Sequence, residues 1–280
     1  MEEIILQRKL EALGQNGTLI RKDGKTFLQL DCENAKELSM KWGEKLYPFT
    51  KTGKKWILEL PFSTAVNYVQ ICVDGQEVLS PDLPIAHGYC RPYNYIELPD
   101  EEGLFELRDV PHGTLTQEFY KSKISDNWEK LIVYLPPCVP SAGLPVLYLQ
   151  HGFGESEISW STTGKVNFLM DNLIAAGKIK PFAIVMGNGM VKQRIDGELK
   201  LNRALYGQML VEEILPMIEK KYQFGGSKEK RGMAGLSMGS VQTTRTICAH
   251  PELFSEVGIF SGFLRDRIVG DEEHDGIVPK

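Results

Sequence analysis

Five short apolar runs, separated by helical segments, constrain the fold of this chain more than any other feature. The runs lie at 131–135, 146–150, 182–186, 232–236 and 257–260. Each run is continuous rather than alternating, which is typical of parallel strands covered on both faces. Apolar residues recur at helical spacing between them, at 166–174, 211–222 and 238–249. This alternation predicts an α/β domain with a doubly wound parallel sheet over residues 116–280.

The chain before residue 115 has a different pattern of short strands and turns. Segments 55–60 and 66–73 alternate apolar and polar residues, and Asp74-Gly75 follows the second of them. An Asp-Gly pair after such a run predicts a hairpin, because Gly accepts the positive φ of a type I′ turn. Residues 80–100 are rich in Pro, Tyr and Gly, so we expect an irregular loop there. Residues 1–115 are therefore predicted to form a β-sandwich domain.

Charge and cysteine content exclude several classes of function. The chain has 32 basic and 37 acidic residues, a net charge of −5, whereas nucleic-acid binding requires a basic surface. No apolar run approaches the roughly 18 residues of a membrane span, and we do not expect the first residues to act as a secretory signal. The five cysteines form no CxxC pair, which indicates buried, reduced thiols and no metal site. We expect a cytoplasmic protein without a cofactor, and its oligomeric state is left open.

The segment Gly235-Leu236-Ser237-Met238-Gly239 is a G-x-S-x-G motif between an apolar run and a helical segment. That context is required for a nucleophile elbow, a tight strand-to-helix turn that presents a serine hydroxyl. Side chains at the two flanking positions would collide, so Gly235 and Gly239 are needed. The turn also places Ser237 at a helix N-terminus, where the helix dipole favours developing negative charge. Ser237 is therefore the predicted nucleophile.

A second motif, Gln150-His151-Gly152-Phe153-Gly154, follows an earlier strand. In hydrolases with this elbow, such a loop supplies one oxyanion-hole amide and the residue after the nucleophile supplies the other. The predicted donors are the backbone N–H groups of Phe153 and Met238, with Gly154 as the alternative to Phe153. His151 is expected to be a structural histidine that bonds the backbone.

Three segments, 144–160, 171–190 and 235–262, resemble the Putative esterase family of α/β-hydrolases, which includes feruloyl, acetyl-xylan and enterochelin-type siderophore esterases. Residues 110–137 resemble the strands that precede that family's catalytic sheet, and VDGQEVLSPDLP is similar to the immunoglobulin-like N-terminal domain of many members. The resemblance covers about residues 65–262. It implies roles for Ser237, Phe153 and Met238 in an acyl-enzyme mechanism. It also suggests that Trp160 packs near the substrate cleft, with a plain core tryptophan as the alternative.

A serine nucleophile needs a histidine base and an orienting acid, which in this fold follow the serine in the chain. Each strand-plus-helix unit takes roughly 30 residues, and the segment after Ser261 is too short for two of them. His274, with Asp271 or Asp266, is a weak candidate because sequence-adjacent groups rarely have triad geometry. His250 is expected to interact with a helix C-terminus. We therefore expect the acid and the base to lie beyond Lys280.

Two classes of function are consistent with these features. The first is a serine carboxylic-ester hydrolase acting on carbohydrate-linked or phenolic acid esters, with a siderophore ester as the alternative substrate. The second is a catalytically silent fragment that binds a glycan or a protein. In that case Tyr89, Tyr93 and Tyr95 could stack on sugar rings, although packing within the sandwich is the simpler role for them. A phosphate-binding loop is excluded, since the glycines at 225–226 lack the GK[ST] ending.

Overall fold

The computed structural model describes residues 3–5, 18–98 and 102–262. The chain divides into two compact units, Met1–Gly103 and Leu104–Lys280, so the boundary lies earlier than the expected one at residue 115. None of the described helices is both long and apolar enough to cross a membrane.

The first unit contains two antiparallel sheets. One has the order β1 (Glu3–Ile5), β2 (Thr18–Lys22), β3 (Lys25–Asp31), β7 (Lys55–Glu59), β6 (Thr50–Thr52). The other has the order β10 (Ile85–Gly88), β11 (Arg91–Leu98), β8 (Ala65–Val73), β4 (Leu38–Trp42), β5 (Lys45–Pro48), with β9 (Gln76–Val78) also paired to β8. One buried cluster joins the two sheets, including Leu28, Trp56, Met40 and Ile71. The unit is therefore a β-sandwich.

The hairpin predicted at Asp74-Gly75 and the loop predicted at 80–100 have different outcomes in the structure. Asp74 and Gly75 have φ values of 50° and 81° between β8 and β9, as a type I′ turn requires. The irregular loop expected at 80–100 is wrong, because β10 and β11 form a hairpin there. Pro92 is compatible with that hairpin, since β11 pairs with β8 only from Asn94 onward and no strand needs the missing N–H.

The tyrosines of this unit agree mainly with packing, the simpler of their two expected roles, whereas two of the cysteines differ from expectation. Tyr95 is fully buried, whereas Tyr89 is 72% exposed. Tyr93 packs between Tyr68 and Tyr89, with ring centroids 5.7 and 6.4 Å away. The three tyrosines therefore do not form one exposed stacking surface. All five cysteines of the chain are free thiols, but Cys90 and Cys138 are exposed rather than buried.

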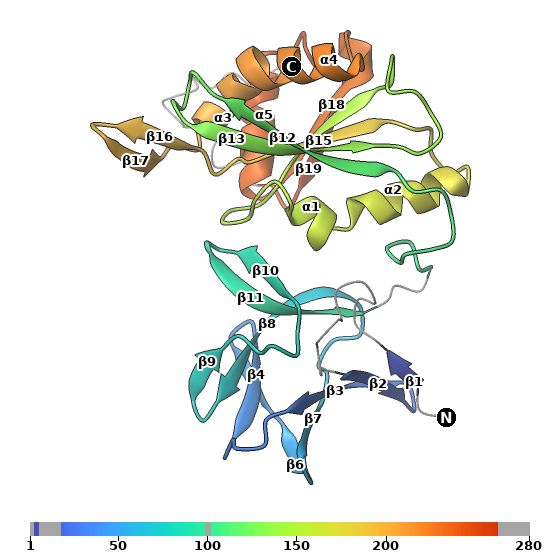
Figure 1. Ribbon diagram of the computed structural model, residues 1–280, viewed down its shortest axis with the longest axis vertical. Helices are drawn as coiled ribbons and strands as arrows, with labels where there is room; N and C mark the ends of the chain where they lie inside the picture. The colour runs from blue at the N-terminus through green and yellow to red at the C-terminus, as the bar shows by residue number, and fades with distance from the viewer. Residues whose placement is uncertain (1–2, 6–17, 99–101, 263–280) are drawn as a thin grey trace. The chain divides into compact units, whose positions relative to one another are not determined.

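The second unit is built on a six-stranded sheet (Figure 1). Its order is β12 (Thr114–Lys121), β13 (Trp128–Leu135), β15 (Ala183–Gly187), β14 (Val146–Gln150), β18 (Arg231–Leu236), β19 (Glu256–Phe260). The last four strands in this order are parallel, but β12 and β13 are antiparallel to their neighbours. The sheet is therefore mixed rather than wholly parallel, because the β12–β13 hairpin extends its edge.

Helices cover both faces of this sheet. One face packs against α3 (Leu205–Met209), the π-helical turn η1 (Leu210–Ile214) and α4 (Leu215–Tyr222), through residues such as Leu210 and Ile218. The opposite face packs against α2 (Val166–Ala175) through Val166 and Met170. The unit also contains the short helix α1 (Ser159–Thr162), the 3-10 turn η2 (Lys228–Lys230) and the helix α5 (Met238–Ala249). A two-stranded arm, β16 (Lys192–Ile195) and β17 (Glu198–Leu201), projects from the unit (Figure 1). The expected doubly wound arrangement is confirmed.

The segment between the sandwich and the sheet is fastened to α2. The Asn172 side-chain amide donates to the backbone oxygens of Leu104 and Glu106, at 2.8 and 2.9 Å. Asp171, which is 2% exposed, accepts hydrogen bonds from the backbone N–H of Gly113 and from His112. This segment, residues 104–113, is called the strap below, and its contacts place it in the second unit.

Candidate active site

Ser237 occupies a strained turn between β18 and α5. β18 ends at Leu236 and α5 begins at Met238, so a single residue reverses the chain direction. Ser237 has φ 51° and ψ −110°, a conformation that a residue with a Cβ atom adopts at a cost of about 1–3 kcal/mol. Its backbone N–H donates to the Phe260 carbonyl oxygen of β19 at 2.9 Å. This neighbouring strand therefore holds the turn in place.

The two glycines of the motif are required by close backbone contacts. A Cβ atom on Gly235 would lie 2.2 Å from the carbonyl oxygen of Gly239. A Cβ atom on Gly239 would lie 2.7 Å from the carbonyl oxygen of His151 and 2.8 Å from that of Gln150. All three distances are far below van der Waals contact. The second clash also shows that the nucleophile turn packs directly on the loop after β14.

That loop is held by its own side chains. The Gly152 N–H donates to the Glu155 carboxylate at 2.8 Å. The His151 Nδ1 lies 2.8 Å from the Gly152 carbonyl oxygen, and its Nε2 accepts the Gly189 N–H at 3.0 Å. Burial lowers the pKa of His151, so the ring is neutral at neutral pH with its proton on Nδ1. His151 therefore has a structural position with both ring nitrogens bonded.

Two backbone donors of the predicted oxyanion hole stay available. Neither the Phe153 N–H nor the Met238 N–H has a hydrogen bond to any described residue. The Gly154 N–H, by contrast, donates to the Met190 sulfur at 3.4 Å, which makes it the poorer donor. Both Phe153 and Met238 line the same cavity as Ser237. The arrangement can present two amides to an oxyanion formed at the serine.

Trp160 does not line this cavity. Its indole N–H donates to the Gln150 carbonyl oxygen at 2.9 Å, and its ring packs 6.0 Å from the ring of Phe260. The indole thus ties α1 to the end of β14. These contacts agree with the alternative of a core tryptophan, and a place near the substrate cleft stays a prediction.

No histidine of the described residues hydrogen-bonds to the Ser237 hydroxyl. His112 is bonded to Asp171, and His151 is occupied as described above. His250 ends α5, where its backbone N–H bonds the Thr246 carbonyl oxygen and its ring lies 3.5 Å from the Glu252 carboxylate. His274, Asp271 and Asp266 lie outside the described residues.

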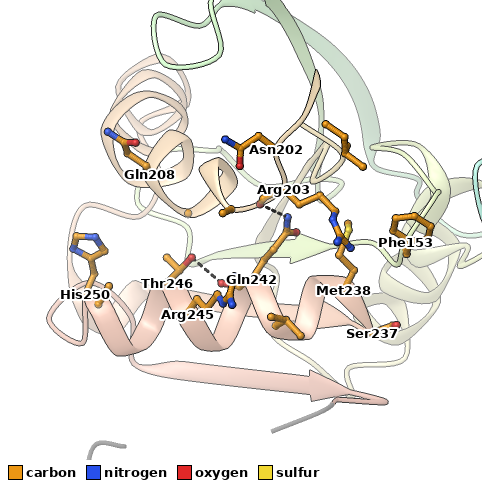
Figure 2. A pocket seen from close by; sticks show the side chains of 15 residues that line it. Phe153, Asn202, Arg203, Gln208, Ser237, Met238, Gln242, Arg245, Thr246 and His250 are labelled. Carbon is orange, nitrogen blue, oxygen red and sulfur yellow. Dashed lines mark hydrogen bonds between the residues drawn. The ribbon is translucent and has the colours of Figure 1, made fainter. Parts of the chain in front are cut away.

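An open cavity of about 700 Å³ lies beside Ser237 and follows α5 toward His250 (Figure 2). Its walls come from the β14 loop, from the segment 201–208 at the start of α3, and from one face of α5. The side chains that sequence reasoning did not identify are mostly polar: Asn202, Arg203, Gln208, Gln242, Arg245 and Thr246. These residues belong to no motif and converge only through the crossing of α3 and α5. At this crossing a Cβ atom on Gly207 would lie 2.7 Å from the Thr246 hydroxyl.

Comparison with known proteins gives consistent matches. A family model described as Putative esterase matches residues 122–273. The endo-1,4-beta-xylanase/feruloyl esterase of Xylanibacter ruminicola is 31% identical over 264 residues, which cover 89% of this chain and 36% of the relative. The chain therefore spans little more than a third of that relative's length.

Two solved structures share the fold. The ferulic acid esterase of Anaeromyces mucronatus in complex with ferulic acid is similar with a TM-score of 0.53 and 22% identity, over 58% of this chain and 63% of the other. The enterobactin esterase of Shigella flexneri in the presence of enterobactin is similar with a TM-score of 0.65 and 12% identity, over 95% of this chain and 76% of the other.

Proposed function

The chain belongs to the Putative esterase family, and on that basis we propose that it is a carboxylic-ester hydrolase that works through a serine acyl-enzyme. The observation that carries the proposal is the geometry at Ser237. Its hydroxyl makes no helix-capping hydrogen bond, and it opens on a cavity that two unpaired amides also line.

Each part of the site has a role in this mechanism. The Ser237 oxygen attacks the ester carbonyl carbon and gives its proton to a base, and the alcohol leaves with that proton. The N–H groups of Phe153 and Met238 stabilise the negative oxygen formed during attack. Losing one such donor typically costs about 3 kcal/mol of transition-state stabilisation. Water then attacks the acyl-enzyme and releases the acid.

The base in this proposal is an imidazole outside the described residues. His112 and His151 are bonded elsewhere, and His250 lies at the opposite end of α5 from Ser237. The described residues therefore supply the nucleophile and the oxyanion hole, while the acid and base come from elsewhere in the protein.

The proposed substrate is a carbohydrate-linked or phenolic acid ester. Support comes from the 31% identical relative, whose name combines a xylanase with a feruloyl esterase. A siderophore ester is the second candidate, because the likeness to the enterobactin esterase extends over both units of the chain. The alternative of a silent binding fragment predicts glycan binding without any covalent chemistry at Ser237.

The proposal is tested by covalent labelling and ester hydrolysis. A fluorophosphonate probe should label Ser237, as located by mass spectrometry. The protein should release ferulate from methyl ferulate, or acetate from an acetylated xylo-oligosaccharide, faster than it cleaves enterobactin. Ser237→Ala should abolish both signals, and Ser255→Ala, at an exposed serine away from the cavity, should leave them intact. Absence of Ser237 labelling together with absence of ester cleavage would refute the proposal.

A further inference from the structure

The cavity beside Ser237 has a charge opposite to that of the chain. Two arginines and a histidine line it, and no Asp or Glu is among its lining residues in the described part of the chain. The whole chain has more acidic than basic residues, so the lining has the opposite sign of charge from the chain as a whole. The acid-free lining therefore points to a ligand with negative charge.

Arg203 is the cation best placed to meet such a ligand. Its guanidinium carbon lies 5.1 Å from the centre of the Phe153 ring, and Figure 2 shows the side chain extending to Phe153 and Met238. It forms no ion pair within the described residues. The Gln242 amide donates to the Arg203 carbonyl oxygen at 3.0 Å, which fixes the backbone at this position. A guanidinium held against an aromatic face can still make bidentate hydrogen bonds to a carboxylate.

The β16–β17 arm extends this charge away from the cavity. Its register pairs Lys192 with Leu201 and Arg194 with Leu199, and directly paired residues share one face of a sheet. Leu201 is itself a lining residue of the cavity. Of the two acidic residues of the arm, Asp196 lies in the turn between the strands, and Glu198 pairs with Ile195 on the opposite face. One face of the arm thus combines two cations with two leucines, which are 47% and 46% exposed.

We call these side chains together the cationic groove: Leu201, Arg203 and Arg245 line the cavity, and Lys192, Arg194 and Leu199 share the face of the arm on which Leu201 lies. α5 alone, with twelve residues, gives the cavity a length of about 18 Å at 1.5 Å per residue. A groove of this length accommodates several linked sugar rings rather than a single small acid. The exposed leucines provide apolar contact for ring faces, and the cations provide contact for acidic substituents.

We propose that the cationic groove binds the carbohydrate portion of the substrate and selects a glycan that carries a carboxylate, that is, a uronic acid residue. This inference rests on the proposed function, since it assigns the non-acyl part of that ester. Arg203 pairs with the carboxylate, and the arm contacts the sugars farther from Ser237.

The test measures binding of ester-free sugars to the protein, so it does not depend on catalysis. A xylo-oligosaccharide with a glucuronic acid branch and a neutral one of equal length are titrated by calorimetry. The acidic sugar should bind about tenfold more tightly, as expected for one charge-assisted pair. Salt at about 0.5 M should remove most of this preference, because it screens exposed charges.

Variants separate the groove from general electrostatics. Arg203→Gln should remove the preference for the acidic sugar, and Arg203→Lys should retain only part of it, since the bidentate geometry is lost. Lys180→Gln removes an exposed charge outside the cavity and should change nothing. Equal binding of the two sugars, or an unchanged preference in Arg203→Gln, would overturn the inference. Tighter binding of 2,3-dihydroxybenzoyl-serine than of the acidic sugar would also overturn it. Failure to label Ser237 would bear only on the catalytic proposal.

Discussion

Backbone strain at Ser237 leads to an unusual prediction about stability. Replacing Ser237 by Gly should give a more stable protein than replacing it by Ala. Both substitutions remove the hydroxyl, so neither variant can be acylated. Only Ala keeps the Cβ atom, which at φ 51° and ψ −110° is the source of the strain, whereas Gly adopts positive φ freely.

The magnitude follows from comparison with a second serine in an ordinary conformation. Ser227 also precedes a helical turn and makes no capping hydrogen bond, but its φ is −143°. At both positions Gly makes the unfolded chain more flexible than Ala does. This contribution cancels when the Gly-minus-Ala difference in unfolding free energy at position 227 is subtracted from the same difference at position 237. The remainder is the strain, about 2 kcal/mol. For a domain of about 150–250 residues this corresponds to about 6 °C in melting temperature.

The assay is differential scanning calorimetry of the four variants at one pH and one protein concentration. The melting temperature of the second unit should be higher in Ser237→Gly than in Ser237→Ala, whereas at Ser227 the Ala variant should melt higher than the Gly variant, because no strain opposes the entropy effect there. If the Gly-minus-Ala difference in melting temperature at position 237 were no larger than that at position 227, the turn at Ser237 would not be strained. The premise about its geometry would then be wrong.

Three further perturbations have outcomes that the structure predicts. Gly239→Ala should lower the free energy of unfolding by about 3 kcal/mol, measured with urea, because the added Cβ would lie 2.7 Å from a carbonyl oxygen. Gly232→Ala is the control and should be tolerated, since its added Cβ would make no contact closer than 3.4 Å. Equal losses in the two variants would contradict this prediction. Burial raises the pKa of the Glu129 carboxyl, and the nearby charges of Glu213 and Glu157 raise it further. The folded state therefore binds the proton more tightly than the unfolded state, and Glu129 lowers the stability of the fold as the pH rises through its folded pKa. Glu129→Gln should therefore raise the melting temperature more at neutral pH than near pH 4, where even the unfolded carboxyl is about half protonated, and a pH-independent shift would refute the assignment. Asp171→Ala should cost about 3 kcal/mol in chemical denaturation, because it leaves the Tyr134 hydroxyl and the Gly113 N–H without their acceptor; a loss below about 1 kcal/mol would show that water replaces it.

The sequence was most informative where local sterics determine the structure. The G-x-S-x-G turn needs glycine on both sides of Ser237 whatever surrounds it, so the elbow could be predicted from five residues. Continuous apolar runs such as 146–150 likewise identified strands buried on both faces. The hairpin of β10 and β11 was missed because Pro, Tyr and Gly within 80–100 are typical of loops, and Pro92 is harmless only where no neighbouring strand reaches it.

The walls of the cavity could not be predicted in the same way. Arg203 and Gln242 are far apart in the chain, and only the packing of α3 against α5 brings them together. Trp160 is a different case: its closeness in sequence to the loop after β14 suggested closeness to the substrate, but its side chain does not line the cavity. Its indole N–H donates instead to the Gln150 carbonyl oxygen. The direction in which a side chain points cannot be read from its distance along the sequence.

The strap has a consequence for how this protein could be divided or recombined. Its backbone oxygens at Leu104 and Glu106 are bound by Asn172, so these residues travel with the hydrolase sheet although they precede its first strand. A gene fusion that joined a new partner at residue 115 would discard the acceptors of the Asn172 amide and two donors to the Asp171 carboxylate, His112 and the Gly113 N–H, while the Tyr134 hydroxyl would remain. A fusion at Gly103 would preserve both. Exchange of the sandwich for another module is therefore least disruptive at that point, where a natural recombination could replace one unit without altering the other.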